Sequence, residues 1–135
     1  MTHEPIRAML EAQRANALLG GASLRRAATN LVAVAGSGRR VVLAFDHAGE
    51  RVIGAAMLTG GSIETFDYTQ AFPDGVEALL VGGYIAGPVD LEAAAEAAVR
   101  AGATRVIAAM LSEWSTTVAN VDTLVNLNRL EARVA

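Results

Sequence analysis

The chain has no cysteine, no lysine and only two histidines. The absence of cysteine excludes disulfides, thiol nucleophiles and cysteine-ligated zinc, and two histidines leave little for an imidazole-rich metal site. We therefore expect neither a bound metal nor a cofactor. Aromatic residues are also scarce, at 4% of the chain, and no dense basic stripe accompanies them. Nucleic-acid binding is therefore not expected.

Long apolar runs are missing as well. No run approaches the ~20 residues that a membrane-spanning helix needs. The first twenty residues contain Glu4, Arg7, Glu11 and Arg14, where a signal peptide would have an uncharged apolar core. These features predict a cytoplasmic protein that does not act at a membrane.

What the chain does contain is ample material for one folded domain. It has 135 residues, of which 53% are hydrophobic and 19% charged. A chain of this length buries roughly two thirds of its unfolded surface in a single core. Charge is distributed unevenly, because residues 1–40 have a net charge of +4 and residues 41–135 a net charge of −7. This asymmetry suits a basic helical layer on an acidic remainder, or a contact between subunits.

The order of apolar segments indicates the fold class. Apolar positions recur at helical spacing over Pro5–Leu19, and Ser23 is a suitable cap for a second helix that ends near Ala35. Further along, apolar runs of strand length alternate with helical segments, which favours parallel pairing with right-handed crossovers. The expected strands are Arg40–Phe45, Ile63–Tyr68, Val76–Val81, Arg105–Leu111 and, in preference to the start of a terminal helix, Asp122–Leu127; the expected helices between them are Glu50–Leu58 and Asp90–Ala101.

These segments predict an α/β fold. We expect a three-layer core with a mainly parallel sheet of four or five strands, preceded by two N-terminal helices. In open sheets of this kind, ligands bind at the carboxyl ends of the strands. Candidate site residues are therefore those that directly follow a strand.

Asp46 and His47 follow the first expected strand. In one interpretation His47 is a general acid or base, and Asp46 orients it or binds a metal. Tyr84 and Trp114 would then converge with them on a small anionic or nucleotide-like ligand, although the tryptophan could equally line an interface. In the other interpretation Asp46 caps the helix that begins near Gly49, and His47 is an exposed loop residue.

The stretch Ala78–Ala101 combines an apolar strand, a glycine-containing loop and an alanine-rich helix closed by Gly102. It resembles the diphosphoribosyl-binding segment of type I phosphoribosyltransferases, and the architectural resemblance covers about residues 40–127. In that family two acidic residues end the strand and bind ribose hydroxyls, and a Thr-Gly-Gly-Thr loop binds the 5′-phosphate. In register, Gly82 and Gly83 occupy the positions of the acidic pair, and the loop corresponds to Gly87, Pro88, Val89 and Asp90.

Departures from the family pattern argue against its chemistry. Glycines cannot bind the ribose, and Pro88 has no N–H to offer a phosphate. We expect Asp90 at the helix cap and Glu92 in the first turn, where their carboxylates would repel a dianion. The family's flexible loop and base-binding hood have no counterpart beyond about Thr69–Gly75.

Two functions follow from this comparison. The first is a non-catalytic phosphoribosyltransferase-like domain that acts as a homodimer or through a partner protein. The second is a small-molecule binding protein or an enzyme, a transferase or lyase for a nucleotide or phosphosugar. Its catalytic residues would be Asp46 and His47, and its ligand-binding residues would be Gly82, Gly83, Tyr84, Gly87, Asp90 and Trp114.

Overall fold

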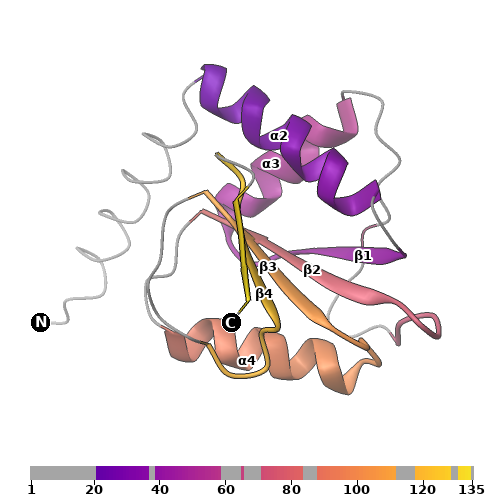
Figure 1. The fold of residues 1–135 in the computed structure, drawn as a ribbon. Helices are drawn as coiled ribbons and strands as arrows, with labels where there is room; N and C mark the ends of the chain where they lie inside the picture. The colour runs from indigo at the N-terminus through magenta and orange to yellow at the C-terminus, as the bar shows by residue number, and fades with distance from the viewer. Residues whose placement is uncertain are drawn as a thin grey trace, which may run out of the picture.

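The computed structural model describes residues 21–36, 39–58, 65, 71–83, 88–111, 118–128 and 131–134. Within these ranges the chain alternates helices with the strands of one sheet, which confirms the predicted α/β class (Figure 1). The predicted helix Pro5–Leu19 lies outside the described residues. The elements are α2 (Gly21–Gly36), β1 (Arg40–Ala44), α3 (His47–Leu58), β2 (Glu77–Gly82), α4 (Pro88–Arg100), β3 (Val106–Met110), β4 (Thr123–Asn126) and β5 (Glu131–Val134).

The described strands form one sheet in the order β1-β2-β3-β4-β5. The first four are parallel, and β5 pairs antiparallel with β4. The predicted strand Asp122–Leu127 is confirmed as β4, whereas β5 was not expected from the sequence. Every residue of β3 is buried, as are the central residues of β1. This explains their continuous apolar sequences, because a parallel strand covered on both faces has no polar side.

A single residue locates the point where the strand order reverses. Thr65 forms a parallel bridge with Val42 of β1. Val42 is already paired with Leu79 of β2, so Thr65 lies along the opposite edge of β1. It belongs to the predicted strand Ile63–Tyr68, whose other residues are outside the described ranges. After β1 the chain thus passes Thr65 on one side of β1 and then forms β2 on the other side. In open parallel sheets, ligands bind at the carboxyl ends of the two strands where the order reverses in this way, here β1 and β2.

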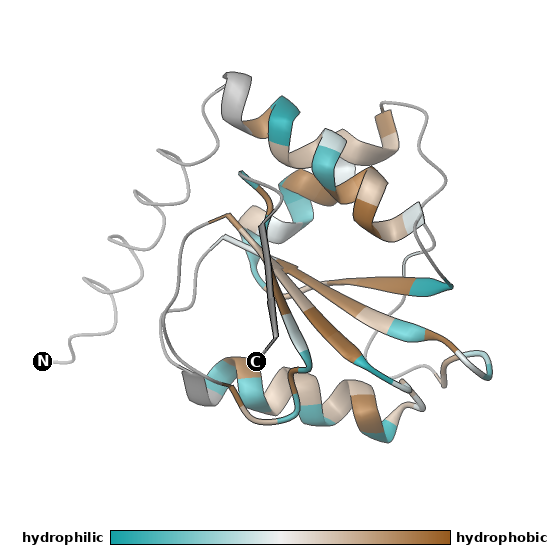
Figure 2. Ribbon diagram, viewed as in Figure 1, coloured by the Kyte–Doolittle hydropathy of each residue, from teal (hydrophilic) through white to brown (hydrophobic). Residues whose placement is uncertain are grey.

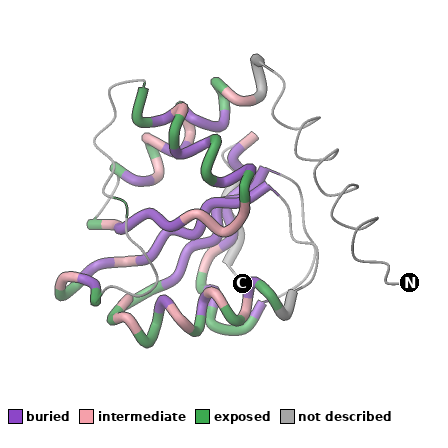
Figure 3. Tube along the Cα trace, turned by 180° about the vertical axis from the view of Figure 1, so that it is seen from behind, coloured by how far each residue is buried: buried purple, intermediate pink, exposed green. Residues whose placement is uncertain are grey.

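The sheet separates two apolar clusters. Alternate side chains of each strand point to opposite faces of the sheet. Helices α2 and α3 cover one face, and α4 covers the other (Figures 1 and 2). Figure 3 shows buried strands between helices whose outer sides are exposed. The α2–α3 side includes Leu31, Val42, Val52, Leu79, Val81, Ile107 and Val125, and the α4 side includes Val41, Leu43, Leu80, Leu91, Val106, Met110 and Leu124.

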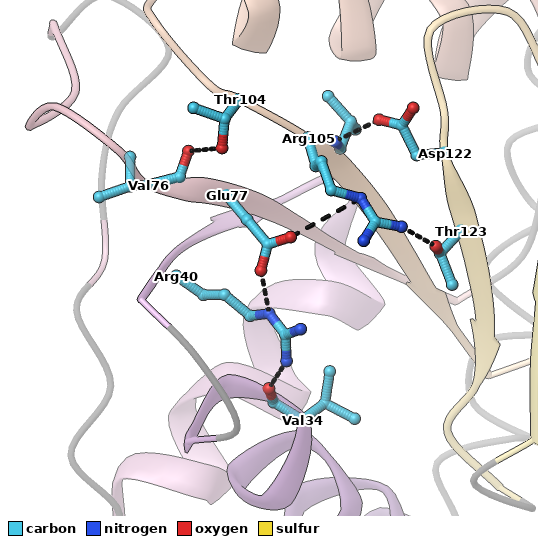
Figure 4. A network of polar contacts seen from close by, with 9 residues as sticks. Val34, Arg40, Val76, Glu77, Thr104, Arg105, Asp122 and Thr123 are labelled. Carbon is cyan, nitrogen blue, oxygen red and sulfur yellow. Dashed lines mark hydrogen bonds and ion pairs between the residues drawn. The ribbon is translucent and has the colours of Figure 1, made fainter.

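Charged side chains tie together the amino ends of the strands (Figure 4). Arg40 Nε lies 3.1 Å from Glu77 Oε1, and Arg105 Nε lies 3.7 Å from Glu77 Oε2. Arg105 Nη2 also donates to Thr123 Oγ1 at 2.9 Å, and Asp122 Oδ2 accepts from Val106 N at 2.8 Å. Arg40, Glu77, Arg105 and Asp122 at the amino ends of the strands thus bind groups of the protein itself. We therefore look for a ligand site at the carboxyl ends of the strands.

Three helix starts differ from the sequence prediction. α2 includes Gly21, so Ser23 lies inside the helix and is not its cap. α3 begins at His47 rather than Glu50, because the Asp46 carbonyl accepts from Glu50 N at 3.1 Å and already closes the first turn. α4 begins at Pro88 rather than Asp90. Proline suits the first helical position, since its N–H would have no partner there and its φ is preset. Among the described residues, no helix is long and apolar enough to cross a membrane.

Candidate functional site at the carboxyl ends of β1 and β2

Asp46 follows β1, and its carboxylate contacts the residue that directly follows β2. Its Oδ1 accepts a hydrogen bond from Gly49 N at 2.8 Å, which caps α3. Both carboxylate oxygens also lie 3.0 Å from Gly83 N, just beyond the end of β2. The predicted capping role is therefore confirmed, and the same carboxylate additionally joins the two strand ends.

Gly49 makes this arrangement possible. A Cβ at this position would lie 1.9 Å from the carbonyl oxygen of Val81 in β2. Only glycine lets the first turn of α3 approach the sheet backbone so closely. Val81 O meanwhile accepts a hydrogen bond from Phe45 N at 2.7 Å. The close approach of α3 to β2 thus brings Asp46 within reach of Gly83.

His47 lies apart from this contact. As the first residue of α3, its side chain is 83% exposed, and its Nδ1 is 3.4 Å from Glu50 Oε2. Asp46 meanwhile binds the backbone N–H groups of Gly49 and Gly83. The structure therefore does not bring His47 and Asp46 together as an acid–base pair.

Gly82 and Gly83, at the end of β2, lie close to side chains of neighbouring elements. A Cβ on Gly82 would lie 2.8 Å from Met110 Sδ and 2.9 Å from Phe45 Cδ1. A Cβ on Gly83 would lie 2.7 Å from the Cβ of Ala48. Leu111 N, at the end of β3, is within 3.1 Å of both glycine carbonyls. A side chain at either glycine would therefore require neighbouring atoms to move.

The start of α4 carries less negative charge than expected. Asp90 is exposed and is the third residue of the helix rather than its cap, because the helix begins at Pro88. Glu92 lies beyond the first turn, and its Oε1 is 3.5 Å from Ala119 N. One carboxylate, not two, therefore faces the positive end of the helix dipole. Tyr84, Gly87 and Trp114 lie outside the described residues.

The short connection before β2 contains a tight turn. Of the segment Thr69–Gly75, residues 71–75 are described, and Gly75 has a φ of 75° in the turn that it forms with Asp74. Phe72 anchors the segment, since its side chain is buried against the α4 side of the sheet. Among the described residues, no group of three or more histidine, aspartate or glutamate side chains could hold a metal ion.

No protein-family model, curated protein or solved structure matches this chain. The resemblance to type I phosphoribosyltransferases therefore stays a prediction from the residue pattern. The possible chemistry of this site is therefore inferred from the hydrogen-bond donors and acceptors at the carboxyl ends of the strands. Among the described residues near the carboxyl ends of β1 and β2, the N–H groups of Gly49 and Gly83 donate to an internal carboxylate, that of Asp46.

A second polar cluster at this edge was missed from the sequence. Asn126 ends β4 and is buried, and its Oδ1 accepts from Asn128 N at 2.9 Å. Asn128 Nδ2 donates to the carbonyl of Leu111, which follows β3. Asn30 of α2 donates to the carbonyl of Leu127. The signal was present as asparagines in and directly after an expected strand, and the cluster fixes the end of β4 to β3 and α2.

Proposed function

We propose that this chain is a non-catalytic phosphoribosyltransferase-like domain that acts by associating with a second copy or with a partner protein. The observation that supports the proposal is the hydrogen bonding of Gly83. Its N–H, directly after β2, donates to both carboxylate oxygens of Asp46 at 3.0 Å. The protein's own anion thus occupies the place where an anionic ligand would bind.

The chemistry of phosphoribosyl diphosphate supports the same conclusion. A ribose ring needs acceptors for its hydroxyls, and the glycines at 82 and 83 offer no side chain; a Cβ at either position would lie within 3.0 Å of a neighbouring side chain. A diphosphate needs free N–H donors and a positive field. The carboxylate of Asp46 is half-buried, so its repulsion of an incoming phosphate is screened less than that of a surface charge.

Calorimetry with phosphoribosyl diphosphate and Mg²⁺ tests the non-catalytic part. We expect no heat of binding up to millimolar ligand for the wild type. Asp46→Asn is the matched variant, because it removes the charge while retaining the size and the capping oxygen. It should also fail to bind, since Gly82 and Gly83 still offer no side chain to hold a ribose. Micromolar binding by the wild type would refute the proposal.

Light scattering on the size-exclusion eluate tests the association part. We expect a mass above that of one chain, rising with protein concentration. A strict monomer at every concentration, together with the absence of a specific partner in pull-downs, would contradict it.

One observation favours the alternative function, a binding protein or enzyme for a nucleotide or phosphosugar. Asp46 lies where the strand order reverses, which is the usual ligand position in sheets of this kind. Thermal-shift screening against nucleotides, sugar phosphates and divalent metals distinguishes the two. A ligand that raises the melting temperature of the wild type but not of Asp46→Ala or His47→Ala would support the alternative.

A further inference from the structure

The helices on the two faces of the sheet carry opposite charge. On one face, α2 and α3 together contain three arginines, Arg25, Arg26 and Arg51, against the single carboxylate of Glu50. All four residues are exposed. We call these two helices the basic layer, and with His47 neutral its net charge is +2.

On the other face α4 has the reverse balance. It contains Asp90, Glu92 and Glu96 against the single Arg100, so its net charge is −2. We call this helix the acidic layer. Glu96 and Arg100 pair with each other on the outer side of the helix. Asp90 is exposed and adds a carboxylate to the same outward surface.

Each layer also exposes apolar side chains near the carboxyl end of a helix. Met57 and Leu58 at the end of α3 are 51% and 90% exposed, and Val99 near the end of α4 is 47% exposed. Each surface also has an exposed small residue, Gly54 on α3 and Ala93 on α4. Two such surfaces can approach closely, bury the apolar side chains and bring opposite charges together.

We propose that the acidic layer of one copy of the chain docks on the basic layer of a second copy. This inference rests on the proposed self-association and names the surfaces that carry it. The layers lie on opposite faces of one sheet, so a pair formed this way leaves one basic and one acidic layer free. The contact is heterologous, and further copies add at the free layers until a ring closes or protein is exhausted.

Salt and charge reversal test the proposal on the purified full chain. We expect sedimentation velocity to show a weight-average mass that rises with concentration beyond two chains at ~0.05 M salt. At ~0.5 M salt, where the Debye length is about threefold shorter than at ~0.05 M, the association constant should fall at least about tenfold.

Two variants give the sharpest readout. In the first, Arg25→Glu and Arg51→Glu make the basic layer acidic; in the second, Ala93→Lys and Glu96→Lys make the acidic layer basic. These four positions are exposed, and circular dichroism melts verify that both variants fold. Each variant alone should sediment as a monomer, because its two layers then have the same sign. Mixed in equal amounts the two should associate again, because every layer of one complements a layer of the other.

The outcomes separate this inference from the proposed function. Association of the mixture but of neither variant alone supports the docking of unlike layers. Association that is unchanged by salt and by both reversals overturns it and assigns self-association to another surface, which leaves the proposed function intact. A wild-type chain that stays monomeric at low salt overturns it too, and the search for a partner protein then decides the proposed function.

Discussion

Two glycines in the same helix should respond in opposite directions to the same substitution. Gly49 and Gly54 both lie in α3. A Cβ on Gly49 would lie 1.9 Å from Val81 O, whereas a Cβ on Gly54 would meet nothing within 4 Å. Alanine therefore tests the close approach of α3 to β2 with a control only five residues away.

The expected cost at Gly49 follows from what has to move. Real Cβ contacts stay above 3.0 Å, so the first turn of α3 would have to withdraw from Val81 by more than 1 Å. That shift strains the packing, at about 1–3 kcal/mol, and weakens the bond from Gly83 N to Asp46, which as a hydrogen bond to a charged group contributes about 1.5–3 kcal/mol. We expect Gly49→Ala to lose about 3–5 kcal/mol of unfolding free energy.

The control should gain stability. Gly54 is exposed within the helix, so Gly54→Ala removes backbone freedom from the unfolded chain and adds about 0.5–1 kcal/mol. Urea unfolding followed by circular dichroism measures both changes. Equal effects of the two substitutions, or wild-type stability of Gly49→Ala, would refute the close contact and with it the placement of Asp46 against Gly83.

Three further substitutions test other parts of the structure. Glu77→Gln should lower the unfolding free energy by about 1–2 kcal/mol in urea melts, because its partner Arg40 has a side chain only 15% exposed. Glu96→Gln, in an exposed ion pair, should cost under about 0.5 kcal/mol. Equal costs of the two substitutions would contradict the difference in burial. Asp46→Ala should cost about 2.5–4 kcal/mol by thermal melting, since the cap and the contact with β2 are both lost, and a neutral result would remove its structural role. Asn120 has a φ of 67°, so alanine there should cost about 1 kcal/mol while glycine should not, and a reversed order would contradict this backbone conformation.

Local patterns were enough to predict most of the described elements. A strand covered on both faces has a continuous apolar run, and β3 is buried along its whole length. Gly102 was expected to end the alanine-rich helix, and it adopts a φ of 115° two residues after the end of α4. The capping role of Asp46 was also readable, because an aspartate before a helix is a local signal.

Contacts between distant segments could not be predicted in the same way. Asp46 and Gly83 are separated by 37 residues, and their bond depends on how closely α3 approaches β2. The residue type at 49 is compatible with such an approach but does not require it. The antiparallel strand β5 was missed for a related reason. Its pairing with β4 is a property of the hairpin, and its short sequence contains both charged and apolar residues.

The number of residues that separate two paired strands in the sequence decreases from β1 to β5, and this separation affects the order in which the strands pair during folding. Arg40 and Glu77 pair across 37 residues, whereas Val106 and Asp122 are joined across 16, and β4 and β5 are consecutive. Closing a short loop costs less entropy than closing a long one. The hairpin and its junction with β3 should therefore form first, and β1 should join last. Ribosomal synthesis delivers these segments in the reverse order, so the apolar face of α2 is made before the strands that bury it.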